Sequence, residues 1–271
     1  HSRVPALYSV HAPVADVARD LGWTTIQVAE EAVLDLPTLS FKGKAFQDVR
    51  TALNRATKEG VRAEWTTWAT CPAGRRDQIA AIGTAAMGEK SLPEMGFTLG
   101  GLAELADEDT RLLLAIDADA TVQGVTSWMP VHRDGAVVGL TLDVMWRREG
   151  GFRPVMDFLI ASAALDAQRE GLEVLSLSGT PWARTQPEGA TADAPGSTSS
   201  RLEAVLDVLG GLLEPAYGFR SLLAYKKKFG PRLVPLHLAV PDLMDAPAVG
   251  LAVARAYLPD LTPADTARFA Q

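Results

Sequence analysis

The alternation of apolar and polar residues in the middle of the chain predicts a strand, a helix and a second strand in direct succession. Apolar and polar side chains alternate over 136–145, as in a strand whose polar face carries Thr141 and Asp143. Apolar residues then recur with a helical period over 155–170, and a short apolar run follows at 172–178. This order predicts a βαβ crossover with parallel strands. Its glycine- and arginine-rich turn is expected at the strand ends, where ligands usually bind.

The rest of the chain shows the same two periods. They predict strands over 25–28, 32–36, 63–70, 112–116, 121–128 and 233–240, and helices over 14–20, 45–59, 73–87 and 202–213. Residues 183–200 have almost no bulky apolar side chain and are expected to form a loop, while 242–270 are expected to form two short helices. Three consecutive strands that lead into a crossover helix and a further strand indicate an α+β fold with a mixed central sheet flanked by helices. This order resembles the GNAT-type N-acyltransferase architecture.

The composition is that of an ordinary globular protein. With 271 residues, of which 47% are hydrophobic and 22% charged, the chain has room for one large domain or two small ones. The single cysteine, Cys71, rules out an internal disulfide, and four scattered histidines predict no metal site. No apolar run approaches the roughly 20 residues that cross a bilayer. Because the first residue is a histidine rather than a methionine, we interpret the chain as part of a longer protein.

Charge is unevenly distributed along the chain. The net charge of −7 argues against indiscriminate binding of polyanions. Between residues 42 and 62, however, six basic residues stand against two acidic ones, a balance of +4. Four of the six are expected on one face of the predicted helix: Lys44, Arg55, Lys58 and Arg62. This face is either simply solvated or a surface for a phosphate-bearing partner, and we favour the partner. A second cluster, over 217–232, carries five basic and no acidic residues.

Several short stretches, taken together, resemble the C-terminal domain of the aminoacyl-phosphatidylglycerol synthases, the multiple peptide resistance factor family. They occur in the family's order across most of residues 20 to 240, at 22–23, 30–36, 43–44, 50, 54–56, 96–100, 142–145, 147, 155–159, 217–219 and 225–229. One departure concerns the family pattern Asp-Leu-Met-Arg. Here Trp146 occupies the position of the arginine, and Arg147 comes one residue later.

The resemblance implies a domain organisation and a reaction. In that family two GNAT-like halves lie in tandem behind a membrane-embedded part, and an amino acid passes from aminoacyl-tRNA to a lipid head group at the cytoplasmic face of the membrane. This chain would then hold an incomplete first half with the basic helix (1–62), a complete catalytic half (63–241) and C-terminal helices (242–271). The implied partners are aminoacyl-tRNA and an anionic phospholipid such as phosphatidylglycerol. No cofactor is implied, because aminoacyl-tRNA is the donor substrate.

An aminoacyl ester is already activated, so positioning, a proton acceptor and stabilisation of the oxyanion suffice for transfer. The chain has no Gly-x-Ser-x-Gly elbow and no Cys-His pair, which agrees with direct transfer. We assign Asp143 as proton acceptor or as ligand of the α-ammonium group, the alternative being a structural carboxylate bonded to the turn at 150–151. Arg147 either holds a phosphate or the oxyanion, or points into water. Lys226 and Lys228 diverge by 200° on a helix, so one of them faces the ligand, and we favour Lys226.

The remaining predicted site residues fall into two groups. The predicted substrate-binding residues are Glu94, Thr141, Arg148, Ser178, Tyr225 and Lys228, and the predicted tRNA-binding residues are Lys44, Arg55, Lys58 and Arg62. Three alternatives remain open: a coenzyme A-dependent N-acyltransferase, a peptidoglycan-type aminoacyl-tRNA transferase, and a non-catalytic module that binds tRNA or lipid. For the first of these, Arg147 and Gly150 match the usual pyrophosphate-binding turn, but bulky Phe152 stands where a small residue is expected.

Overall fold

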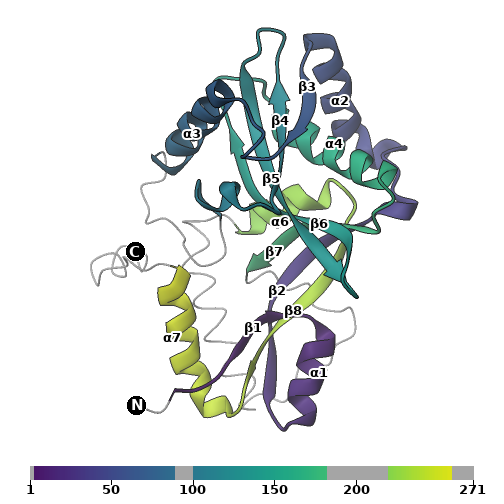
Figure 1. Cartoon of the computed structure of the whole chain (residues 1–271). Coiled ribbons are helices and arrows are strands. Elements are labelled where there is room, and N and C mark those ends of the chain that lie inside the picture. The colour runs from purple at the N-terminus through teal and green to yellow at the C-terminus, as the bar shows by residue number, and fades with distance from the viewer. Residues whose placement is uncertain (1–2, 89–99, 182–218, 258–271) are drawn as a thin grey trace.

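The structure, a computed structural model, describes residues 3–88, 100–181 and 219–257, which are built around one eight-stranded sheet (Figure 1). The strands are β1 (Leu7–Val10), β2 (Thr24–Asp35), β3 (Arg62–Thr66), β4 (Arg111–Ile116), β5 (Val122–Arg133), β6 (Ala136–Arg147), β7 (Val174–Pro181) and β8 (Arg232–Val240). Their order in the sheet is β1-β8-β2-β7-β6-β5-β4-β3. The predicted α+β fold with a mixed central sheet is confirmed.

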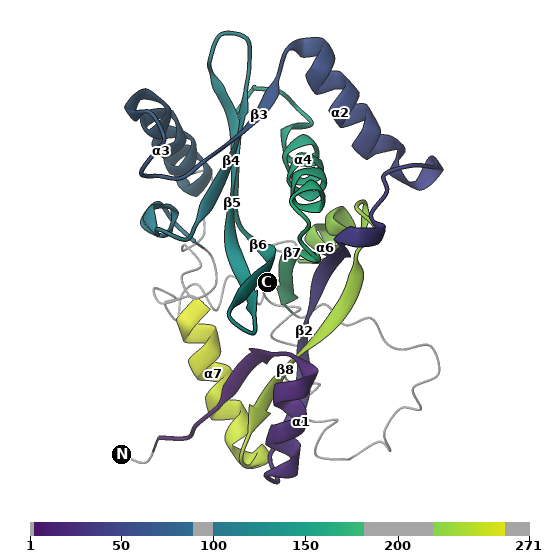
Figure 2. The same cartoon turned by 45° about the vertical axis from the view of Figure 1, so that its right-hand side comes forward.

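Helices cover the sheet and its ends. The α-helices are α1 (Ala12–Asp20), α2 (Gln47–Glu59), α3 (Ala73–Gly88), α4 (Val155–Arg169), α6 (Phe219–Lys227) and α7 (Ala246–Tyr257), and the short 3-10 turns are η1 (Leu36–Thr38), η2 (Lys44–Phe46), η3 (Glu104–Ala106) and η4 (Leu243–Asp245). In Figure 2, α3 lies on one side of the strands β4 to β6, and α2 and α4 lie on the other. No helix in the described ranges is long and apolar enough to cross a bilayer.

The predicted crossover is confirmed. Strands β3 to β6 form an antiparallel meander, α4 follows, and β7 pairs with β6 in parallel. β7 in turn pairs with β2, and β2 with β8, in antiparallel fashion. The amino-terminal segment therefore extends the sheet of the central part. The predicted division into two halves at residue 62 stays a prediction. Strands from both sides of this residue belong to the same sheet.

Several sequence-based element boundaries are wrong, and some predicted elements lie outside the described residues. The strand expected over 63–70 ends at Thr66, because Thr70 Oγ1 accepts the N–H of Thr67 in a turn. The separate strands expected at 25–28 and 32–36 are one strand, β2. Hydrogen bonds to β7 on one edge and to β8 on the other continue through the polar residues Glu30 and Glu31 in its middle. The helix expected from residue 45 begins at Gln47, after the tight turn η2. The loop at 183–200, the helix at 202–213 and the last part of the 242–270 pair are not among the described residues.

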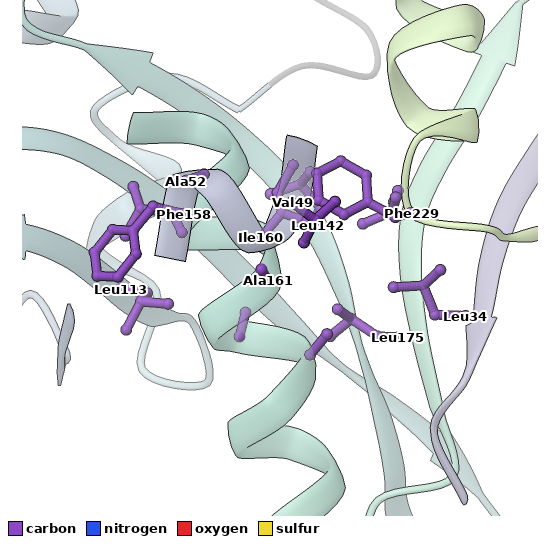
Figure 3. Close-up of a cluster of buried hydrophobic side chains, with 14 of the residues drawn as sticks. Leu34, Val49, Ala52, Leu113, Leu142, Phe158, Ile160, Ala161, Leu175 and Phe229 are labelled. Atoms are coloured by element: carbon purple, nitrogen blue, oxygen red, sulfur yellow. The ribbon is translucent and has the colours of Figure 1, made fainter. Parts of the chain in front are cut away.

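The core joins the amino-terminal segment to the central part. Its largest cluster combines Leu34 of β2 and Val49 of α2 with Leu142 of β6, Leu175 of β7 and Phe229 (Figure 3). A second cluster lies under α3 on the opposite face of the meander. Strand β4 contributes side chains to both clusters. Its apolar side chains point alternately to the two faces of the sheet, and all of these side chains are buried. The strands next to α4 are thus fixed by packing from both sides.

Candidate active site

Strands β6 and β7 part in the middle of the sheet, at a place that we call the fork. Their parallel pairing covers only Gly139 to Thr141 of β6 and Val174 to Ser176 of β7, although both strands continue well beyond. The fork consists of residues 142–143 of β6 and 177–180 of β7. On its other edge β7 shifts register against β2 at the same level, which marks a β-bulge. Because a bulge bends its strand and re-aims the side chains, it accounts for the divergence of β7 from β6.

Ser178 sits at this bulge in an unusual backbone conformation. Its φ of 66° lies in the left-handed region, which costs a residue with a Cβ roughly 1 kcal/mol. Its N–H donates to Ser176 Oγ over 3.0 Å, and its own Oγ donates to the carbonyl oxygen of Leu142 on β6. A side chain therefore replaces the missing backbone hydrogen bond across the fork. Non-glycine residues held in this conformation cluster at functional sites.

Lys226 of α6 reaches the same bulge from one side. Its side chain is 3% exposed. Its Nζ donates to Ser178 O over 3.0 Å, to Gly179 O over 3.1 Å and to Thr180 Oγ1 over 3.2 Å. Burial lowers the pKa of Lys226 to about 8, and the carboxylate of Glu31 opposes that change. All three ammonium protons are thus used to hold β7, and they place a positive charge at the fork.

Asp143 provides the carboxylate on the β6 side, one residue beyond Leu142. Its Oδ1 accepts the N–H of Gly100 over 2.9 Å, so the alternative in which the turn at 150–151 holds this carboxylate is wrong. Burial raises the pKa of Asp143, and the charge of Glu104 adds to the rise, while hydrogen bonds from Gly100 and Ser127 oppose it. A carboxylate with a raised pKa, half-buried within a central strand beside the point where β7 departs, is suited to accept a proton.

Lys228 and Tyr225 form a separate cluster with a residue that sequence reasoning did not select, Asp157. Lys228 Nζ lies 2.6 Å from Asp157 Oδ2 in the first turn of α4 and 4.9 Å from the centre of the Tyr225 ring. The buried Tyr225 hydroxyl lies near Asp157 but outside hydrogen-bond geometry. Burial is the main cause that raises the pKa of Tyr225, and the negative charge of Asp157 raises it further. The expected divergence of Lys226 and Lys228 is therefore confirmed. Only Lys226 lies at the fork.

The two arginines at the end of β6, Arg147 within the strand and Arg148 directly after it, differ sharply. Arg147 is exposed, and its guanidinium has no partner among the described residues. Arg148 is partly buried and donates to Val122 O over 2.7 Å and to Gln78 Oε1 over 3.0 Å. Arg148 thus ties the end of β6 to β5 and α3, which gives it a structural role. Arg147 is not engaged by the part of the chain that the structure describes.

The predicted basic face is only partly helical. Lys44 lies in η2 and Arg62 in β3, so the argument from helical spacing holds for Arg55 and Lys58 and is wrong for the other two. All four side chains are exposed. Arg55 pairs with Glu59 over 2.7 Å, and Arg62 approaches Glu64 to 3.8 Å. Among the described residues, Lys44 and Lys58 have no acidic partner.

The structure thus brings some predicted site residues together and leaves others apart. Asp143, Ser178 and Lys226 meet at the fork, and Thr141 pairs with Ser176 at its base. Glu94 is not among the described residues. In the part of the chain that the structure describes, no three His, Cys, Asp or Glu side chains gather as metal ligands. Gly100 was missed as a contact of Asp143, and its only sequence signal was its place in the matching stretch 96–100.

A meander, a crossover helix and a parallel strand that departs at a polar fork are the arrangement that was predicted for a GNAT-like fold. Residues 1–240 match the protein family described as phosphatidylglycerol lysyltransferase, C-terminal. The chain belongs to this family, whose members are transferases.

Individual relatives agree with this assignment. An uncharacterized protein of Corynebacterium glutamicum is 46% identical over 94% of this chain and 31% of its own length. The lysylphosphatidylglycerol biosynthesis bifunctional protein LysX of Nocardia farcinica is 28% identical over 95% of this chain and 22% of its own. The chain therefore spans a third or less of these relatives. The structure of L-PGS from Bacillus licheniformis has the same fold, with a TM-score of 0.74, 20% identity, and coverage of 93% of this chain and 72% of that one.

Proposed function

We propose that this chain transfers an aminoacyl group from aminoacyl-tRNA to a lipid head group, phosphatidylglycerol or a related anionic lipid, at the cytoplasmic face of the cell membrane. The observation that carries the proposal is the half-buried Asp143 at the fork, with its raised pKa, in a chain of this family. A membrane-embedded region preceding these residues in the whole protein is part of the proposal. No cofactor takes part, because the ester of the donor is already activated.

In the proposed reaction a hydroxyl of the lipid head group attacks the carbonyl carbon of the aminoacyl ester. Asp143 accepts the hydroxyl proton as the new carbon–oxygen bond forms. The ester bond to the tRNA ribose then breaks, and the proton passes from Asp143 to the departing ribose oxygen. A carboxylate whose pKa is raised towards the working pH is a stronger base for the first step and still releases the proton in the second. No covalent enzyme intermediate is needed.

The two cations have different roles in this proposal. The Lys226 protons are engaged by β7, so Lys226 acts through its charge and by holding the bulge rather than by binding the substrate directly. Its positive charge in a buried position favours the oxyanion that develops at the ester carbonyl. The guanidinium of Arg147, which has no partner among the described residues, suits a phosphate of the lipid or of the tRNA end.

The turn before α4 weighs against coenzyme A as the donor. In that alternative, backbone N–H groups of the turn bind a pyrophosphate. Here the N–H of Phe152 donates instead to Oε1 of Gln123 over 2.9 Å, and Gln123 is itself anchored to Asp117 Oδ2 over 2.6 Å. A Cβ on Gly151 would lie 2.5 Å from the same Gln123 oxygen. The Phe152 N–H is thus already engaged by a side chain of the protein, and an anion would have to displace Gln123 to receive it.

The test is transfer of radiolabelled amino acid from a total aminoacyl-tRNA pool into lipid-extractable material. Label that enters phosphatidylglycerol from one amino acid, and that is lost in Asp143→Ala, supports both donor and acceptor. Label in a soluble acceptor instead would change the acceptor and favour the peptidoglycan-type alternative. Binding of tRNA or lipid without any transfer would overturn the enzymatic proposal and leave the non-catalytic module.

A second prediction concerns the basic surface around α2. The double variant Lys44→Ala/Lys58→Ala should bind aminoacyl-tRNA several-fold more weakly at low salt, because both cations lack acidic partners among the described residues. The negative slope of log K against log salt should become shallower by about 1.5, since each phosphate contact that is lost contributes roughly 0.7 to 0.9 to its magnitude. The control Arg3→Ala/Arg255→Ala removes the same charge from the residues before β1 and from α7, and both of these elements lie well below α2 in Figure 1. Equal slopes in both variants would exclude this surface from tRNA binding.

A third prediction concerns Gly100, whose backbone approaches Asp143 closely. A Cβ at this position would lie 1.9 Å from Asp143 Oδ2, so Gly100→Ala must displace the carboxylate. We expect kcat to fall by about 10- to 100-fold with little change in the KM for the donor. Gly74→Ala is the matched control, because nothing lies within 4 Å of the added methyl group. Unchanged kcat in Gly100→Ala would mean that the position of Asp143 does not matter.

A further inference from the structure

A chain of hydrogen bonds runs from the protein surface to the bulge of β7. His11, at the start of α1, is exposed, and its Nε2 lies 2.6 Å from Glu31 Oε2 on β2. The other oxygen of Glu31, Oε1, accepts from the hydroxyl of the buried Ser176, and Ser176 Oγ accepts the N–H of Ser178. Three side chains and one backbone group thus connect three elements that are far apart in sequence.

The chain of hydrogen bonds ends where the fork begins. Ser178 is the residue with left-handed φ whose hydroxyl spans to β6 and whose carbonyl oxygen binds Lys226. The peptide groups of Ser178 are therefore held between opposite charges. The Glu31 carboxylate acts on its N–H through Ser176, and the Lys226 ammonium binds its carbonyl oxygen directly. Such a conformation persists only where the surroundings enforce it. Glu31 and Lys226 are the two charged groups that do so.

We propose that Glu31 is a positioning residue, which fixes the β7 bulge through Ser176 and thereby sets the geometry of the fork. This inference rests on the proposed function for its effect on turnover. The hydrogen-bond geometry itself does not depend on that function. Glu31 does not contact the reacting atoms. It acts through Ser176 and Ser178, in the way that groups behind a reactive centre orient the groups in front.

The helix α6 packs against β2 and β7, and β7 carries no charged residue. β2 contributes Glu31 and the buried Glu30, α4 contributes Asp157, and α6 with its last turn contributes Lys227 and Lys228. Of these, Glu31 raises the pKa of Lys226 against the effect of burial. Replacing Glu31 by a neutral residue should therefore move the titration of Lys226 further down from its value of about 8.

The experiment compares three variants with the wild-type chain. Glu31→Gln keeps an oxygen to accept from Ser176 and removes the charge, Glu31→Ala removes both, and Ser176→Ala removes the intermediate hydroxyl. We expect the two alanine variants to lose about tenfold or more in kcat with little change in the KM for the donor. Glu31→Gln should keep most of the turnover at neutral pH, and the alkaline limb of its pH profile should move to lower pH. Asp35→Asn is the control, because this exposed residue of the same strand pairs with Arg232 away from the fork.

A readout that needs no activity keeps the inference separate from the proposed function. Amide hydrogen exchange of Ser178, followed by NMR, should speed up at least tenfold in Glu31→Ala and Ser176→Ala and stay unchanged in Asp35→Asn. The NMR titration of Lys226 should move down in Glu31→Gln. Absence of transfer in every protein, wild type included, would count against the proposed function, and the exchange data would still decide on Glu31. Ser178 exchange in Glu31→Ala equal to that of the wild type would overturn the inference.

Discussion

The variant Asp143→Asn is expected to lose transfer by about 100- to 10,000-fold, the usual contribution of a positioned general base, and yet to be more stable than the wild type. Asparagine has nearly the same shape, and its Oδ1 can still accept the N–H of Gly100. It cannot take up the proton of the attacking hydroxyl. The loss should therefore appear in kcat, with the fold intact.

The gain in stability follows from the sign of the pKa change. Burial raises the pKa of Asp143 in the folded protein above its ordinary value of 3.8. The folded state thus favours the protonated form, so the contribution of Asp143 to stability is full below the unfolded pKa and is lost as pH rises through the folded pKa. At neutral pH the ionised, partly buried carboxylate lowers the free energy of unfolding, and the neutral asparagine side chain removes this destabilisation. Thermal unfolding should show the variant gaining more stability over the wild type at pH 7 than at pH 3, which lies below the ordinary pKa of 3.8.

Two results would contradict this account of Asp143. Full transfer by Asp143→Asn would remove this residue from the mechanism. A variant that is less stable than the wild type at pH 7 would mean that the carboxylate is a structural group. Asp166→Asn is a suitable control, because Asp166 accepts a hydrogen bond from Trp65 Nε1 over 2.8 Å in a partly buried position away from the fork.

The variant Lys226→Ala should show the largest loss of stability that we predict. It leaves two backbone carbonyls and Thr180 Oγ1 without their donor and opens a cavity in a place that is 3% exposed. Lost hydrogen bonds and packing together should cost about 2 to 4 kcal/mol, which in a domain of this size lowers Tm by roughly 5 to 15 °C. Lys227→Ala, at an exposed neighbouring position, should stay within about 0.5 kcal/mol of the wild type. Equal stability of the two variants would show that Lys226 does not hold β7.

The pH dependence of stability provides a second test of Lys226. Its pKa is about 8 in the folded protein, against an ordinary value of 10.5. Between these values the unfolded chain binds more protons than the folded one, so the stability contributed by this group rises with pH. Relative to Lys226→Met, which keeps the volume without the charge, the wild type should gain stability from pH 8 to 10. A constant difference over that range would mean that the pKa of Lys226 is not lowered.

The elements themselves followed closely from local patterns. Period-2 and period-3.6 apolar spacing determined the meander, α4 and β7, because each of these segments buries one face or both against its neighbours. The prediction failed where long-range pairing overrode local signals. In β2, two separate strands were predicted over 25–28 and 32–36, but hydrogen bonds to both flanking strands keep the strand continuous. The basic residues Lys44 and Arg62 were assigned to a helix that does not include them.

The sequence by itself determined the α+β order, the family resemblance and the candidates Asp143 and Lys226, since these depend on spacing and residue type. Only the tertiary structure decided which candidates meet. Lys226 reaches Ser178 across 48 positions, and Gly100 reaches Asp143 across 43. Likewise Arg148 and Lys228 prove to be engaged by Gln78 and Asp157. Contacts at such separation are set by how the elements pack and by where β7 bulges, and no local pattern in the chain records either.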